Sequence, residues 1–147
     1  MIALRLVHLI ESHSDELAAG LQKKFQTSPH TRDLQKVPAH ELRDRSYDVY
    51  CNLSGWLLNA KESEIESCYR EIGARRAAQD VSLSDLCWAI MLTKEHLWDF
   101  LEEQGFLKST MELLGELELL RLLDRFFDRA IYYATDGYMH AQVSRVA

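Results

Sequence analysis

Proline, glycine and cysteine are all scarce in this sequence. With two prolines and six glycines in 147 residues, there are few places for a chain of many short strands to turn, so long helices are favoured. The three cysteines, Cys51, Cys68 and Cys87, form no CxxC pair, and an odd number is typical of a reducing compartment. We interpret them as small buried or half-buried thiols.

Long apolar runs and an excess of positive charge are missing as well. No stretch approaches the roughly 18 uninterrupted apolar residues of a membrane-spanning helix, and the apolar start of the chain has no cleavage site for a signal peptide. The formal net charge of −6 repels phosphate backbones. We therefore predict a cytoplasmic protein without a nucleic-acid or membrane partner.

Patterns that carry catalysis or metal binding are not found either. No two of the six histidines are three or four residues apart, the spacing that would place both on one helical face. The chain also lacks a Glu-x-x-His pair, a G-x-S-x-G motif and a cysteine-protease signature. We predict that the protein is not an enzyme and has no metal site and no cofactor.

Apolar residues that recur at helical spacing are what the sequence does contain. They predict main helices over about residues 2–27, 39–60, 63–79, 83–104 and 109–140, in a single domain spanning 1–147. Both prolines fall in 28–38, which we interpret as a surface connector. The predicted fold is all-α, a globin-like or related helical bundle with a long C-terminal helix. Ser-x-x-acidic patterns beginning at Ser63, Ser82 and Ser109 predict three of the helix starts.

The last helix has an unusually wide apolar surface. Stepping 100° per residue, its apolar side chains cover an arc of about 200°, whereas a one-sided surface helix needs about 100°. Such a helix either lies in the middle of its own domain or packs on a second chain in a symmetric dimer. We favour the homodimer, because a C-terminal helix is often only partly covered by the rest of its own chain. The predicted dimer stripe is Leu119, Leu123, Phe126, Ala130 and Tyr133.

A ligand pocket is a second hypothesis. The aromatic residues could line an apolar pocket, and an arginine at its edge could pair with a ligand carboxylate. We place Trp56, Trp88 and Arg76 at the edge of such a pocket for a small apolar or acidic ligand. Ordinary core packing of the tryptophans and a surface ion pair for the arginine are the alternatives.

Residues 69–89, YREIGARRAAQDVSLSDLCWA, carry a family resemblance. The segment resembles the helix–turn–helix of globin-type bacterial sensors, in which the residue three after the glycine is the haem-ligating histidine. Here Gly73 is followed at that offset by Arg76, and a guanidinium stays protonated and cannot bind iron. Residues 126–133 and Tyr138 look like the exit helix of the same group.

From about Leu4 to His140, the chain therefore resembles the non-haem, globin-like N-terminal sensor domain of RsbR-type stressosome proteins, the RsbT co-antagonist family. Similar domains precede some histidine kinases. The resemblance implies a dimeric sensor that passes signals through its exit helix to an output domain or a regulatory protein partner. The alternative hypothesis is a haem-binding gas or redox sensor that uses His96 or His8.

Overall fold

The protein is all-α in this computed structural model, which describes residues 3–104 and 110–146. Neither range contains a strand, so the predicted fold class is confirmed, while the globin-like arrangement stays a prediction. No helix in these ranges is long and apolar enough to cross a membrane. The elements are α1 (Ala3–Ser12), α2 (Ser14–Thr27), the 3₁₀ helix η1 (Arg32–Lys36), α3 (Ala39–Cys51), the π-helical turn η2 (Gly55–Asn59), α4 (Glu62–Ala78), α5 (Leu83–Glu103) and α6 (Thr110–Val146).

The predicted helices differ from the observed ones mainly at their ends. The segment predicted over 2–27 is two helices that meet at His13, where Ser12 Oγ donates to the carbonyl of Leu9 at 2.8 Å and competes with the helical hydrogen bonds. The segment predicted over 39–60 ends as an α-helix at Cys51, and the π-helical turn then begins at Gly55. The last helix continues past residue 140 to Val146.

The predicted helix starts have different outcomes. Ser82 caps α5, because its Oγ accepts a hydrogen bond from the backbone N–H of Asp85 at 3.3 Å. Ser63 does not cap α4, which begins one residue earlier and has Lys61 at its N-cap without a side-chain bond. The predicted helix start is therefore confirmed to within one residue, but the predicted cap at Ser63 is wrong. The predicted starts at residue 2 and at Ser109 lie outside the described residues.

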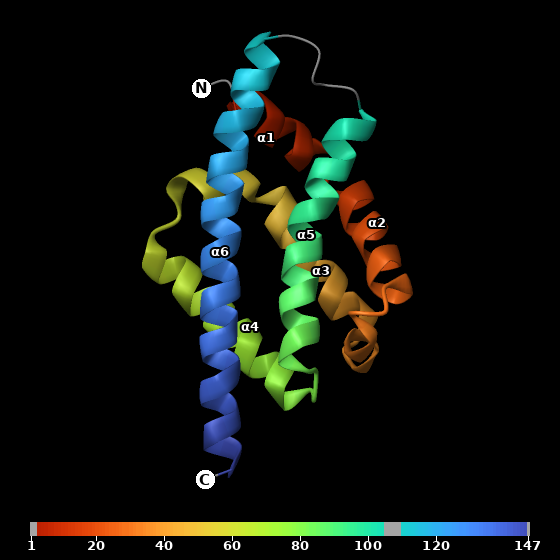
Figure 1. Cartoon of the computed structure of the whole chain (residues 1–147), viewed down its shortest axis with the longest axis vertical. Helices are drawn as coiled ribbons and strands as arrows, with labels where there is room; N and C mark the ends of the chain where they lie inside the picture. Colours follow the sequence, from red (N-terminus) through yellow and green to blue (C-terminus); the bar gives the residue numbers. More distant parts are fainter. Residues whose placement is uncertain (1–2, 105–109, 147) are drawn as a thin grey trace.

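Helix α6 runs the full length of the molecule and contacts α4, α1 and α5 (Figure 1). In this view α5 lies beside α6, and α4 crosses behind it. The C-terminal end of α6 extends beyond the other helices. The core lies between α6 and the other helices, and its large, fully buried side chains include Tyr50, Leu97, Leu101 and Phe127.

The stripe predicted to form the dimer interface faces this core instead. Leu119, Leu123, Phe126 and Ala130 are at most 2% exposed, and Tyr133 is half-buried and donates a hydrogen bond to Glu62 at 3.2 Å. The predicted interface is therefore wrong at the four buried residues, whereas the homodimer itself stays a prediction. They form part of the core of their own chain, where they cannot contact a second chain.

Helices α4 and α6 approach each other more closely than side chains would allow, and glycines make this possible. A Cβ atom added to Gly73 of α4 would collide with the backbone carbonyl oxygen of Ala134 on α6. A Cβ atom added to Gly137 of α6 would collide with the backbone carbonyl oxygen of Arg70 on α4. The two backbones are thus in direct contact at two points.

Candidate functional site

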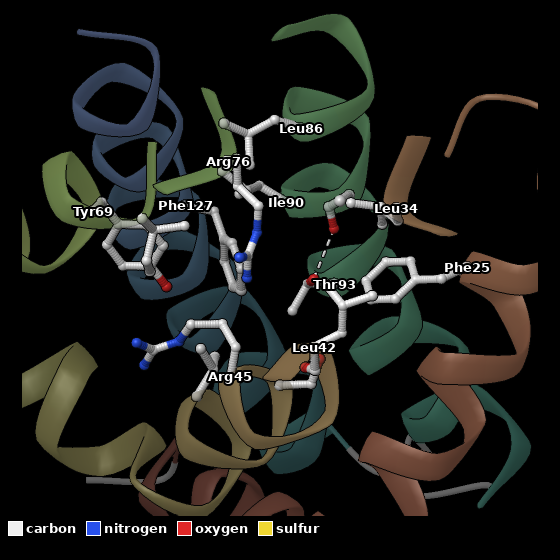
Figure 2. Close-up of a pocket in the computed structure, with 14 residues that line it drawn as sticks. Phe25, Leu34, Leu42, Arg45, Tyr69, Arg76, Leu86, Ile90, Thr93 and Phe127 are labelled. Atoms are coloured by element: carbon white, nitrogen blue, oxygen red, sulfur yellow. Dashed lines mark hydrogen bonds between the residues drawn. The ribbon is translucent and has the colours of Figure 1, made fainter. Parts of the chain in front are cut away.

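Side chains of α3, α4 and α5 enclose a small cavity, with additions from α2, η1 and α6 (Figure 2). Its volume is about 60 Å³. Two of the hydroxyl groups in its wall bond within their own helices. Ser46 Oγ donates to Leu42 O at 3.0 Å, and Thr93 Oγ1 donates to Ala89 O at 2.7 Å. The wall, which is mainly apolar, consists of Phe25, Leu34, Leu42, Arg45, Ser46, Val49, Tyr69, Ile72, Arg76, Leu86, Ala89, Ile90, Thr93 and Phe127.

A larger and more polar pocket of about 370 Å³ lies next to this cavity, between α3 and α4. Arg45, Ile72 and Arg76 line both spaces, so they form the boundary between them. We call the first space the inner cavity and the second the outer pocket. The remaining residues of the outer pocket are Glu41, Asp44, Asp48, Cys68, Glu71 and Arg75. An apolar space thus adjoins a charged one, with two arginines at the boundary.

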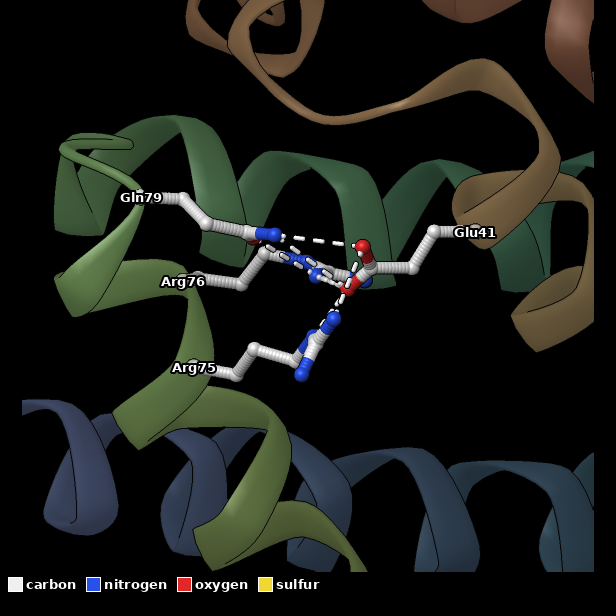
Figure 3. Close-up of polar contacts among 4 residues, drawn as sticks. All are labelled: Glu41, Arg75, Arg76 and Gln79. Carbon is white, nitrogen blue, oxygen red and sulfur yellow. Dashed lines mark hydrogen bonds and ion pairs between the residues drawn. The ribbon is translucent and has the colours of Figure 1, made fainter.

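Glu41 holds Arg75 and Arg76 of α4 in place (Figure 3). Its carboxylate accepts hydrogen bonds from Arg76 Nη1 at 2.8 Å, from Arg75 Nη2 at 3.2 Å and from Gln79 Nε2 at 3.2 Å. Arg75 Nε donates to the same carboxylate. The side chain of Arg76 is only 4% exposed, whereas that of Arg75 is 63% exposed. Glu41 therefore neutralises a buried cation, which would otherwise be costly.

The proton affinity of Glu41 reflects these contacts. The hydrogen bond from Arg75, followed by the hydrogen bond and charge of Arg76, lowers the pKa of Glu41 to about 2, although partial burial acts in the opposite direction. The carboxylate consequently stays charged throughout the physiological range of pH.

Arg45 is the second arginine at the boundary. Its Nη2 forms an ion pair with Asp48, and its Nη1 lies 3.6 Å from the sulfur of Cys68. Its Nε is buried and has no hydrogen-bond partner among the described residues. Burial raises the pKa of the Cys68 thiol, although the charge of Arg45 acts in the opposite direction.

The three residues predicted to line the pocket are not together in the structure. Arg76 lies at the boundary of both spaces, as the hypothesis required. Trp56 lines a different surface pocket beside α6 and packs on Tyr69 and Phe126. Trp88 lies on the outer side of α5 and is 36% exposed, and the centroid of its ring is 4.2 Å from that of the tilted His30 ring. The two tryptophans therefore do not line the inner cavity.

Glu41 and Arg45 are the site residues that the sequence did not reveal. Both come from α3, which is separated from Arg76 by about 30 residues of chain. No local spacing relates an acidic residue on one helix to an arginine on another, so only the fold brings them together.

The candidate haem ligands lie away from the pocket. None of the residues that line the inner cavity or the outer pocket is a histidine. His96 Nε2 is within 3.0 Å of the carbonyl oxygen of Leu17, and His8 is exposed. The inner cavity is also far below the several hundred Å³ typical of sites for large organic ligands. These residues do not fit a haem.

The pocket is connected to α6 by three kinds of contact. Phe127 of α6 lines the inner cavity directly. The hydroxyl of Tyr138, also on α6, donates to the carbonyl of Val81 at 2.6 Å, and the N–H of Val81 donates to the carbonyl of Arg76 at 3.1 Å. The glycine contacts between α4 and α6 are the third. A change at the boundary arginines therefore has short paths to the C-terminal helix.

Residues 14–146 match the family model described as the RsbT co-antagonist protein rsbRD N-terminal domain. The chain belongs to this family, which implies a regulatory, sensor-type domain of stressosome proteins. No curated protein and no solved structure shows significant similarity to it.

Proposed function

We propose that this chain is a regulatory sensor domain in which occupancy of the pocket sets the position of α6, and that α6 then acts on a protein partner. The observation that carries the proposal is the backbone contact between α4, which bears Arg76, and α6 at Gly73 and Gly137. Closely packed elements transmit displacements because they cannot deform gradually. A shift of α4 at the pocket is therefore passed to α6.

The test fills the inner cavity without any ligand. Ala89→Leu adds three carbon atoms to a buried position in the cavity wall. We expect hydrogen–deuterium exchange to change in α4 and in the C-terminal half of α6, in addition to α5 itself. Ala78→Leu at the exposed end of α4 is the matched control and should leave α6 unchanged.

A change of exchange confined to α5 in the Ala89→Leu variant would contradict the proposed coupling. An equal response to Ala78→Leu would contradict it as well, because the effect would then not depend on the cavity.

We also propose that the protein is a homodimer, with an interface on the outward face of α6 in place of the predicted stripe. Leu113, Leu117 and Leu120 are 51%, 62% and 39% exposed, and their i, i+4, i+7 spacing puts them on one side of the helix. Leucines that are this exposed and this close together are typical of helix–helix contacts between chains. A second copy would cover them with the same stripe about a twofold axis.

Solution mass tests the dimer. Twice the chain mass is expected for the unaltered protein, and Leu117→Glu should give a monomer because a charge would be buried in the interface. Met91→Glu is the control, since Met91 is also an exposed apolar residue but lies on α5. A monomeric mass for the unaltered protein would exclude this interface.

The partner is proposed from the family. Its description names an RsbT co-antagonist, so we propose a regulatory protein as the target of α6 in this chain. Co-purification with a candidate partner, carried out with Leu117→Glu and with Met91→Glu, separates partner binding from dimerisation. If the monomeric variant retains the partner, the partner uses another face.

A further inference from the structure

We propose that the pocket binds a short-chain monocarboxylate, whose carboxylate takes the place of Glu41 on Arg76 and whose alkyl group enters the inner cavity. The inference rests on the proposed sensor function, since it names the ligand class for the same pocket. Glu41 is then an internal occupant that an outside carboxylate displaces.

The arginine site already holds a carboxylate, which shows that its geometry suits one. Glu41 uses both of its oxygens there, with Arg76 Nη1 on one and Arg75 Nη2 on the other. Such two-oxygen recognition by guanidinium groups is specific for planar anions. Glu41 reaches this site from another helix, α3, so its side chain can leave without disturbing the helix that carries the arginines.

The outer pocket provides the space for this exchange. Its volume of about 370 Å³ can accommodate the carboxyl group of a ligand together with a displaced Glu41 side chain. The exposed guanidinium of Arg75 gives an arriving anion its first contact. Arg45 lies at the same boundary with a buried Nε that lacks a partner among the described residues, so a second cation faces the site.

The inner cavity limits the length of the alkyl group. A volume of about 60 Å³ equals the space that about two water molecules take in the liquid, so the cavity admits an alkyl group of only a few carbon atoms. Its apolar wall, with Leu42, Ile72, Ile90 and Phe127, gains nothing from a second polar group. Butyrate is therefore the expected size, and a much longer chain cannot enter fully.

Calorimetric titration of the unaltered protein with acetate, propionate, butyrate and octanoate tests the ligand class. We expect the affinity to rise about fourfold per methylene group from acetate to butyrate, and octanoate to bind more weakly than butyrate. Butan-1-ol, which lacks the charge, should bind more weakly than butyrate. An affinity that continues to rise to octanoate would indicate adsorption to exposed apolar surface and would overturn the proposal, as would undetectable binding of butyrate.

Glu41→Gln tests whether Glu41 is the competitor. Removing its charge frees the arginines, so butyrate should bind about tenfold more tightly if Glu41 blocks the site for nine-tenths of the time. Asp44→Asn is the matched control, because it changes the charge of the same pocket by the same amount and Asp44 has no ion pair with Arg75 or Arg76. Equal affinities in the two variants would overturn the role given to Glu41.

The experiments can show separately whether the ligand class is wrong and whether the proposed sensor mechanism is wrong. Ala89→Leu should abolish butyrate binding because it fills the inner cavity, while Ala78→Leu should not. If butyrate fails to bind but Ala89→Leu still alters α6, the ligand class is wrong and the sensor mechanism stands. If butyrate binds as expected and α6 does not respond to the filled cavity, the mechanism is wrong and the ligand class stands.

Discussion

Replacing Gly73 by alanine is the most direct test of the contact between α4 and α6. The added methyl group meets the backbone carbonyl of Ala134, which cannot rotate away as a flexible side chain could. Overpacking of this kind costs up to about 3 kcal/mol. Alanine returns about 1 kcal/mol through its better helix propensity. The expected net loss in the free energy of unfolding is therefore about 2 kcal/mol.

Urea denaturation followed by circular dichroism measures this loss, and Gly55→Ala is the control. A Cβ atom at Gly55 meets nothing within 4 Å, so that variant should be as stable as the unaltered protein or slightly more stable. The double variant Gly73→Ala/Gly137→Ala should lose less than the sum of the single losses, because one separation of the helices relieves both collisions. A Gly73→Ala protein as stable as the unaltered chain would refute the backbone contact.

Three further perturbations follow from the contacts at and around the pocket. The folded state lowers the pKa of Glu41 from its ordinary value of 4.5 to about 2, so the stability that the charged Glu41 contributes is complete above pH 4.5 and is lost as the pH falls toward 2. In the Glu41→Gln variant, the free energy of unfolding measured with urea should therefore depend less on pH in this range. An unchanged pH dependence would count against the ion cluster. Burial lowers the pKa of His96 below its ordinary value of 6.5, so the unfolded chain takes up the proton first and the stability of the fold should decrease as the pH drops below 6.5. His96→Gln should remove this decrease. If the decrease remains in the variant, another group causes it. Tyr138→Phe removes the buried hydrogen bond to Val81 and should lower the free energy of unfolding by about 1–3 kcal/mol. Tyr132→Phe, at an exposed position, is the control and should have no effect. Equal stabilities of the two variants would show that the hydrogen bond contributes nothing.

The sequence predicted the helices better than it predicted what covers them. The spacing of apolar residues in the last helix correctly indicated that Leu123 and Phe126 are buried. A helix buried against its own chain and a helix buried against a partner chain show the same spacing. The choice between them depends on where α1, α4 and α5 lie. That placement is a property of the whole fold, and no local pattern in the sequence reports it.

The same limit applies to the candidate site. Arg76 was chosen because a guanidinium can pair with a ligand carboxylate, which is a property of the residue type alone. Trp88 was chosen for its large ring, yet it lies two residues before Ile90 on α5, and two residues on a helix are about 200° apart. One therefore faces the inner cavity and the other faces outward. Glu41 could not be found at all, because its partners are on another helix.

The position of the glycine contact along α6 decides which movements its two ends can receive. The helix has 37 residues, about 55 Å at 1.5 Å per residue, and Gly137 is only about 14 Å from its C-terminal end. If α6 tilts about Gly137, its C-terminal end moves about a third as far as its N-terminal end, because it is about a third as far from Gly137. Rotation of α6 about its axis and sliding along that axis reach the C-terminal end undiminished, because a hydrogen-bonded helix is stiff. Under the proposed sensor function, rotation or sliding of α6 therefore transmits a signal to its C-terminal end better than a tilt does.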